Sequence, residues 1–184
     1  MVGFRKIKDI NKVIFRNDDV LLSTKGLRMT GSMKTSLRSN TFFGHFKEMD
    51  KIFEKYSLLS TLTILADGIE HNPDWIQYIK ERKHRFTIEL HGYDHRNYID
   101  VSAEEGYVLL KDAKERIEQT FNTKVTRWYP PFSKLGFTDW GPEVCEKLGI
   151  GYNNIEGYYT INLHYWNTRD RNNLTTLLQK YYGF

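Results

Sequence analysis

An acidic pair, Asp18-Asp19, and two histidines four residues apart, His91 and His95, are the residues of this sequence best suited to chemistry. Two histidines at this spacing can bind one metal ion if the backbone turns between them, and Gly92 permits a tight turn. One acid of the pair can supply a third ligand, which leaves the other carboxylate as a base. These residues therefore predict a His/His/Asp metal site with an open coordination position, as a hydrolytic metal ion requires.

Each of these motifs also has a simpler interpretation. Adjacent acids at a strand end often form a turn or a helix cap, and an H-x-x-x-H motif occurs by chance. If Asp18 and Asp19 lie in a strand, their side chains point to opposite faces, so one could bind metal while the other faces a water. Asp94 is a candidate to orient one of the imidazoles. His164 is either a buried histidine with a satisfied hydrogen bond or a general acid.

Strands that alternate with helices are expected to position these residues. Lys12–Arg16 is apolar and β-branched, which predicts a buried strand that ends in a polar turn at Asn17-Asp18-Asp19. Phe86–Leu90 predicts another strand, which delivers His91. We expect further strands at 58–66, 125–129, 150–153 and 158–163, a long loop at 20–41, and helices at 44–56, from 72, at 102–121, at 140–148 and at 170–182.

The alternation of strands and helices predicts an α/β fold with a parallel sheet or barrel. Sites in such folds lie at the C-terminal ends of the strands. The acidic pair, His91, Pro130-Pro131 and His164 all fall at the end of a predicted strand or just after it. This common position indicates one shared site more strongly than any single motif does.

Composition limits the class of protein. The 184 residues predict one domain, and 40% hydrophobic with 27% charged residues is typical of a soluble globular protein. We find no apolar run long enough to span a membrane and no apolar core of a signal peptide near Met1, so we expect a cytoplasmic location, although a mature secreted form would look the same. Cys145 is the only cysteine, which excludes an internal disulfide.

Positive charge is concentrated near the N-terminus. Residues 1–40 hold nine Lys or Arg and three Asp, whereas the remainder holds 18 basic and 20 acidic residues. The excess around positions 25–38 fits a solvated loop or a site for an anionic ligand such as a phosphorylated or acidic sugar. Nucleic-acid binding is not expected, because no recognised nucleic-acid motif accompanies the charge. The sequence does not determine the oligomeric state.

The order of the motifs resembles that of the polysaccharide deacetylases, carbohydrate esterase family four, which share the NodB-homology domain. The segment from Phe15 to Val20 resembles the first motif, a strand that ends in an Asp-Asp pair. The segment from Phe86 to His95 is close to the second motif. Other segments that resemble the family pattern are Thr61–Leu65, Trp128–Phe132 and Asn162–His164, so that the resemblance covers roughly residues 12–166.

The resemblance implies a distorted, partly open parallel (β/α) barrel, with a single domain over residues 1–184. It implies that Asp18 is the general base, and that Asp19, His91 and His95 hold a divalent metal ion. Zinc is typical of the family, and Co²⁺, Ni²⁺ and Mn²⁺ are alternatives. His164 would protonate the leaving amine. In addition, the backbone N–H of Phe132 would help to hold the oxyanion.

The sequence departs from the family pattern at two places. The family has an arginine directly before Pro-Pro that orients the base, whereas this chain has Tyr129; Arg127, on the same strand face, is the predicted substitute. The family's fourth motif, which contains an acid and a tryptophan, has no clear match. Residues predicted to contact a sugar substrate lie near the motifs: Tyr93, Tyr129, Pro130, Pro131, Phe132 and Trp166.

Three functions stay open at this point. The resemblance implies a metal-dependent hydrolase that removes N-acetyl groups from an amino sugar or glycan. The missing arginine and fourth motif instead favour a catalytically silent carbohydrate-binding or assembly protein that keeps the fold. A metal-dependent amidase with a non-sugar substrate is the third interpretation. Chelator-sensitive release of acetate from N-acetylated sugars separates the first interpretation from the other two.

Overall fold

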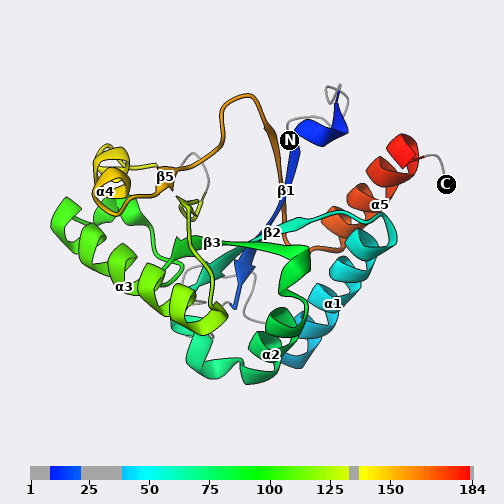
Figure 1. Cartoon of the computed structure of the whole chain (residues 1–184), viewed down its shortest axis with the longest axis horizontal. Helices are drawn as coiled ribbons and strands as arrows, with labels where there is room; N and C mark the ends of the chain where they lie inside the picture. Colours follow the sequence, from blue (N-terminus) through cyan, green and yellow to red (C-terminus); the bar gives the residue numbers. More distant parts are fainter. Residues whose placement is uncertain (1–8, 22–38, 133–136, 183–184) are drawn as a thin grey trace.

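One parallel sheet of six strands forms the centre of the molecule. The computed structural model describes residues 9–21, 39–132 and 137–182. The strand order is β5-β4-β3-β2-β1-β6, and the sheet curls into the half-barrel that the sequence predicts (Figure 1). The strands are β1 (Val13–Val20), β2 (Ser60–Leu65), β3 (Phe86–Gly92), β4 (Arg127–Trp128), β5 (Gly151–Tyr152) and β6 (Tyr159–Leu163).

Helices lie around this sheet in two groups. In the view of Figure 1, α3 and α4 lie to the left of the strands, whereas α1 and α5 lie to the right and α2 lies at the bottom, near α1. The helices are α1 (Ser39–Lys55), α2 (Pro73–Glu81), α3 (Ala103–Phe121), α4 (Gly141–Lys147) and α5 (Thr168–Tyr182), with 3-10 turns at Ile10–Lys12, Ala66–His71, Lys83–Arg85 and Tyr98–Asp100. Among the described residues, no helix combines the length and the apolar character that a membrane span requires.

Local sequence signals explain where the helices begin and end. Ser102 accepts a hydrogen bond from the Glu105 amide at 3.2 Å and is therefore the N-cap of α3, the helix that the sequence predicts at 102–121. This helix ends at Asn122, which has φ 46°. Helix α2 begins at Pro73, also as predicted, although the Asn72 side chain donates to the Gly68 carbonyl instead of capping α2.

Two strand boundaries differ from the sequence-based prediction. β1 does not turn at the acidic pair but continues to Val20, because Val20 still pairs with Ile64 of β2. β4 is shorter than expected. The amides of Thr126 and Arg127 donate to the buried Glu89 carboxylate at 2.8 and 2.7 Å, so they are not available to a neighbouring strand. The predicted loop at 20–41 lies largely outside the described residues, and α1 begins at Ser39.

An aromatic part of the core connects the helices to the end of β1. The Tyr165 ring packs edge-on against Trp75 and Phe46, with ring centroids 5.1 and 6.0 Å apart. All three side chains are buried. The Tyr165 hydroxyl donates to the backbone carbonyl of Asp19 at 3.0 Å. Packing between the helices and the sheet therefore holds the backbone that presents the acidic pair.

Candidate metal centre and active site

The end of β1 is irregular at the acidic pair. The register with β2 shifts between Asn17 and Val20, and Asp19 has φ 61°. Aspartate is one of the few residues other than glycine that adopt this left-handed conformation readily. Strict alternation of side chains, which the sequence analysis assumed here, does not hold across such a bulge. Asp18 and Asp19 are both buried, and the charge of His91 acts on both carboxylates.

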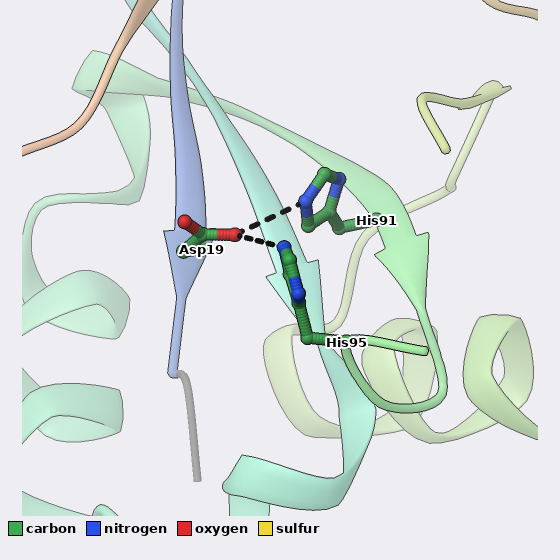
Figure 2. Close-up of side chains that lie close together, drawn as sticks. All are labelled: Asp19, His91 and His95. Atoms are coloured by element: carbon green, nitrogen blue, oxygen red, sulfur yellow. Dashed lines mark ion pairs between the residues drawn. The ribbon is translucent and has the colours of Figure 1, made fainter. Parts of the chain in front are cut away.

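Asp19, His91 and His95 come together across the sheet. Figure 2 shows Asp19 reaching from β1 toward His91 on β3 and His95 just after β3. Asp19 Oδ1 lies 3.2 Å from His91 Nε2 and 3.0 Å from His95 Nε2. One ligand atom from each residue falls within 4.8 Å of the others. The three predicted metal ligands therefore form one cluster at the C-terminal ends of the strands.

The geometry of this cluster fits a shared metal ion. Asp19 Oδ1 is buried and, among the described residues, has no hydrogen-bond partner of good geometry, although two imidazole nitrogens are close to it. Ligands about 2.0–2.1 Å from one ion lie roughly 3 Å apart along the edges of its coordination shell. Burial tends to raise the pKa of Asp19, but the two imidazoles hold it well below its usual range. Asp19 is therefore a carboxylate, as a ligand must be.

A backbone carbonyl sets the orientation of His91. His91 Nδ1 lies 2.6 Å from the carbonyl oxygen of Tyr129. A carbonyl can only accept, so Nδ1 carries a hydrogen, and Nε2 is the ring nitrogen that faces Asp19. Asp94, which the sequence analysis considered for this task, instead holds Arg96 at 2.7 and 2.8 Å.

Gly92 allows the turn that returns His95 to the cluster. A Cβ atom at this position would lie 2.7 Å from the Tyr98 hydroxyl and 2.9 Å from the Asp94 carbonyl oxygen, so a side chain would push the turn apart. The His95 ring then packs edge-on against Phe132, with centroids 4.7 Å apart. The turn that the sequence predicted from Gly92 is present, and it depends on close approach of the chain.

Asp18 lies beside the metal cluster with its own partners. Arg16 Nε donates to Asp18 Oδ1 at 2.6 Å, and Arg16 Nη2 donates to Oδ2 at 2.8 Å. The Thr63 hydroxyl, from β2, donates to Oδ1 at 2.9 Å. Burial tends to raise the pKa of Asp18, but the charges of Arg16 and His91 lower it below its usual value. Asp18 is therefore ionised and able to accept a proton.

Arg127 does not lie where the sequence analysis expected it. Its Nη1 donates to the carbonyls of Asn153 and Tyr152, at 3.0 and 3.4 Å. The guanidinium covers Gly151, where a Cβ atom would approach it to 2.6 Å. Arg127 therefore bonds to the backbone at the end of β5 and just after it. Among the described residues, the arginine that bonds to Asp18 is Arg16.

His164 follows β6 and faces the cluster from the other side. Its Nε2 lies 3.9 Å from Asp19 Oδ2, and its Nδ1 lies 3.2 Å from Asp170 Oδ2. The same Asp170 oxygen accepts the backbone N–H of His164 at 2.9 Å. Burial tends to lower the pKa of His164, but Asp170, Asp19 and Asp18 raise it above its usual value. The ring therefore presents Nε2 to the cluster while Asp170 holds Nδ1.

The residues predicted to contact a sugar divide into two groups. Phe132 and Trp166 are half-buried and contact His95 and His164, so they border the cluster. Phe132 also has φ 62°. The others lie further back: Pro130, Pro131 and Tyr129 are buried, with Tyr129 only 2% exposed, and Tyr93 lies beneath the guanidinium of Arg116 at 5.4 Å.

Three residues of the site were missed by the sequence analysis: Arg16, Thr63 and Asp170. Arg16 carried a usable signal, because it stands two residues before Asp18 and therefore on the same face of a strand. The family pattern, in which the arginine stands directly before the two prolines, favours Arg127 instead. Thr63 and Asp170 had no comparable signal, because their partners become neighbours only when β2 and α5 are in place.

The family model for polysaccharide deacetylases matches residues 44–152. This match covers more than half of the chain. The chain belongs to the polysaccharide deacetylase family. The matched part includes His91 and His95 and excludes both the acidic pair and His164, so the structure is what joins these polysaccharide-deacetylase residues into one cluster.

Solved structures of family members have the same fold. A family 4 carbohydrate esterase pseudoenzyme from Bacillus anthracis superposes with a TM-score of 0.68 at 16% identity, covering 93% of this chain and 60% of that one. A peptidoglycan deacetylase from Bacillus subtilis gives 0.63 at 14% identity, covering 91% and 81%. A family 4 carbohydrate esterase from Bacillus anthracis gives 0.64 at 15%, covering 94% and 76%. No curated protein sequence matches the chain.

This polysaccharide deacetylase chain is short beside some of these relatives. It spans about 60% of the length of the pseudoenzyme structures that it matches. At these identities the likeness concerns the fold alone.

Proposed function

We propose that this protein is a metal-dependent hydrolase that removes N-acetyl groups from an amino sugar or glycan. The observation that carries the proposal is the convergence of Asp19 Oδ1 with the Nε2 atoms of His91 and His95 at 3.2 and 3.0 Å. Asp18 and His164 flank this cluster. Membership in the polysaccharide deacetylase family supports the same reaction class.

The donor set is one oxygen and two imidazole nitrogens, which suits zinc and also Co²⁺, Ni²⁺ or Mn²⁺. Asp19, His91 and His95 would hold the ion, and three protein ligands leave a position for substrate or water. A divalent ion bound there polarises an acyl carbonyl and makes a bound water more acidic. The remaining steps are proton transfers, for which this chain supplies two side chains.

Asp18 is the proposed general base. Its Oδ1 accepts from both Arg16 and Thr63, whereas Oδ2 accepts only from Arg16 among the described residues. A carboxylate oxygen can accept two hydrogen bonds, so Oδ2 keeps the capacity to take a proton from the attacking water.

His164 is the proposed general acid. Asp170 holds Nδ1, so the second ring nitrogen, Nε2, is the one directed at the cluster. A protonated Nε2 can donate to the departing amine as the C–N bond breaks. Asp170 keeps the ring in this orientation and favours its charged form, as a carboxylate does beside a catalytic histidine.

Acetylated sugars are the proposed substrates. Phe132 and Trp166 border the cluster and contact His95 and His164, so a ring bound at the cluster would meet aromatic surface from both sides. Aromatic side chains suit the apolar faces of a sugar ring because they bury area without demanding hydrogen bonds.

A second candidate is a carbohydrate-binding or assembly protein that has lost catalysis. One observation favours it: a solved structure of the same fold is described as a pseudoenzyme. A mutant of that protein is described as having restored enzymatic activity, so the fold alone does not decide between an active and a silent member.

Acetate release tests the proposal. The purified protein is incubated with N-acetylated sugars and glycans, before and after chelation and after zinc is restored, beside the Asp19→Ala variant. Acetate that disappears with chelation, returns with zinc and is absent from Asp19→Ala supports the hydrolase. One bound metal ion without acetate from any substrate supports the silent protein. Acetate release that chelation does not change contradicts the metal-dependent mechanism.

A further inference from the structure

The guanidinium of Arg16 is fixed against both oxygens of Asp18. The two donor distances are 2.6 and 2.8 Å, and the side chains are only 4% and 6% exposed. A bidentate contact of this kind defines the plane of the carboxylate as well as its position. A buried arginine is costly unless it is well paired, so this geometry is strongly specified.

Tyr129 supplies the other side of the Arg16 site. The Arg16 Cζ atom lies 4.6 Å from the centre of the Tyr129 ring. The ring contributes its face, and cation–π attraction is strongest where water is excluded. Tyr129 is 2% exposed, so it is a support for Arg16 and does not offer a surface to substrate.

Tyr129 also stands at the position directly before Pro130-Pro131, from which an arginine could reach Asp18. Here the charge comes from β1, and the position before the prolines carries a neutral ring. Both elements end at the same edge of the sheet, so either can place a guanidinium on the same carboxylate. Two guanidinium groups at this point would repel each other, which explains why one of the two positions is neutral.

We propose that Arg16 is the positioning residue for Asp18 in the deacetylation reaction, and that Tyr129 is the support that holds its guanidinium. The inference rests on the proposed function, in which Asp18 is the base. By occupying one side of both carboxylate oxygens, Arg16 leaves the free acceptor position on Oδ2. Arg16 acts only through Asp18, because its polar contacts among the described residues are with that carboxylate.

Kinetics with an N-acetylated substrate that the protein deacetylates provide the first test. Arg16→Met should lower kcat by about 100-fold, because a displaced base loses its alignment with the reacting water, while KM and bound metal stay unchanged. Arg16→Lys should be intermediate, because lysine keeps the charge and loses the bidentate contact. If Arg16→Met does not fold, Arg16→Lys carries the test. A wild-type kcat in Arg16→Met or Arg16→Lys overturns the proposal.

Moving the arginine provides a sharper test. The double variant Arg16→Met/Tyr129→Arg should have a kcat at least about 10-fold above that of Arg16→Met. The reason is that an arginine just after β4 returns a positive charge to Asp18. No recovery overturns the role assigned to position 129. Arg127→Met distinguishes the two arginines. A loss of kcat in that variant, with none in Arg16→Met, assigns the positioning of Asp18 to Arg127 and overturns the proposal.

Arg82→Met is the matched control. Arg82 also bonds to a buried aspartate, Asp50, at 2.9 Å and lies 5.3 Å over a tyrosine ring, Tyr78, but it is part of the packing between α1 and α2. It should lower thermal stability and leave kcat within about twofold of wild type. An equal loss of kcat in Arg82→Met and Arg16→Met would show that the Arg16 effect is structural, and would overturn the proposal.

Thermal unfolding tests the arrangement without relying on catalysis. Tyr129→Arg should lower Tm in the wild-type background, where two guanidinium groups meet, and raise it in Arg16→Met, with the two effects differing by about 5 °C. If this coupling is found but no substrate releases acetate, the proposed function fails and the Arg16–Tyr129 arrangement stands. If acetate is released but the coupling is absent, the arrangement fails and the proposed function stands.

Discussion

Two clusters in this molecule are built from the same three residue types, arginine, aspartate and tyrosine. One is Arg16, Asp18 and Tyr129 at the ends of β1 and β4. The other lies between α1 and α2 and centres on Asp50, which accepts from the Tyr78 hydroxyl at 2.7 Å and from Arg82 at 2.9 Å. Both aspartates are buried.

The clusters differ in how they use the tyrosine and in what lies beside the carboxylate. In the α1–α2 cluster Tyr78 donates its hydroxyl, and a second arginine, Arg85, reaches Asp50 Oδ1 at 3.2 Å. Burial and the Asp50 charge raise the pKa of Tyr78, so it stays a donor. Every donor around Asp50 thus holds helices together, and both arginines are partly in contact with solvent.

At the strand ends, Tyr129 meets Arg16 with its ring face, and the Arg16 guanidinium reaches both oxygens of Asp18. The charges of His91 and His164 also lower the pKa of Asp18, so this carboxylate belongs to the polar site at the strand ends. The comparison teaches that one set of side chains can stabilise a fold or prepare a base. Both carboxylates accept three side-chain hydrogen bonds from the described residues, so the outcome depends on what lies beside them: packed helices at Asp50 and the histidine cluster at Asp18.

Removing the carboxylate charge should separate the clusters most clearly. Asp18→Asn should lower kcat by about 10³-fold and keep bound metal, because the general base is lost while Asp19, His91 and His95 are intact. Asp50→Asn should leave kcat unchanged and cost about 3 kcal/mol in the free energy of unfolding, because two arginines lose their partner. Acetate assays and urea unfolding measure the two effects. Wild-type turnover in Asp18→Asn would remove this residue from the mechanism.

Metal removal should affect only the strand-end region. At about 100 times its dissociation constant, a metal ion contributes roughly 2.7 kcal/mol to folding, which is about 5–10 °C in Tm for a chain of this size. Chelation should therefore lower Tm in wild type and in Arg82→Met by the same amount, and should leave Asp19→Ala unchanged. Differential scanning fluorimetry gives the result. A chelation effect that persists in Asp19→Ala contradicts its role as a ligand.

Removing the two tyrosine hydroxyls distinguishes a tyrosine that donates a hydrogen bond from one whose ring packs against an arginine. Tyr78→Phe should cost about 1–2 kcal/mol, because it removes a hydrogen bond to a charged carboxylate. Tyr129→Phe should change stability and kcat little, because the ring beneath Arg16 is kept. Equal losses in the two variants, measured by chemical unfolding, would mean that the Tyr129 hydroxyl has a role that the ring face does not explain.

The smallest effect is expected at the exposed edge of the α1–α2 cluster. Glu54 lies 2.7 Å from Arg82 Nη2, and its side chain is 50% exposed. Glu54→Gln should cost less than about 0.5 kcal/mol, and 0.5 M NaCl should remove most of that difference because exposed pairs are screened. A larger, salt-independent loss would show that the cluster depends on Glu54 as much as on Asp50.

The sequence by itself determined which segments form strands and which polar residues stand at their ends. Alternating apolar and helical segments predicted the parallel sheet, and the motif order predicted that Asp19, His91 and His95 form one cluster, which the structure brings together. Such features can be read from the chain because strand periodicity and turn residues are local properties.

Only the tertiary structure decided which side chains support the base and the acid. Arg127 was expected on Asp18, yet it is turned toward β5, while Arg16 reaches the carboxylate and Asp170 reaches His164. The physical reason is that a buried charge must be paired by whichever group the packed elements bring within about 3 Å. That distance depends on the bulge at Asp19, the register of neighbouring strands and the docking of α5, none of which is a local property of the sequence.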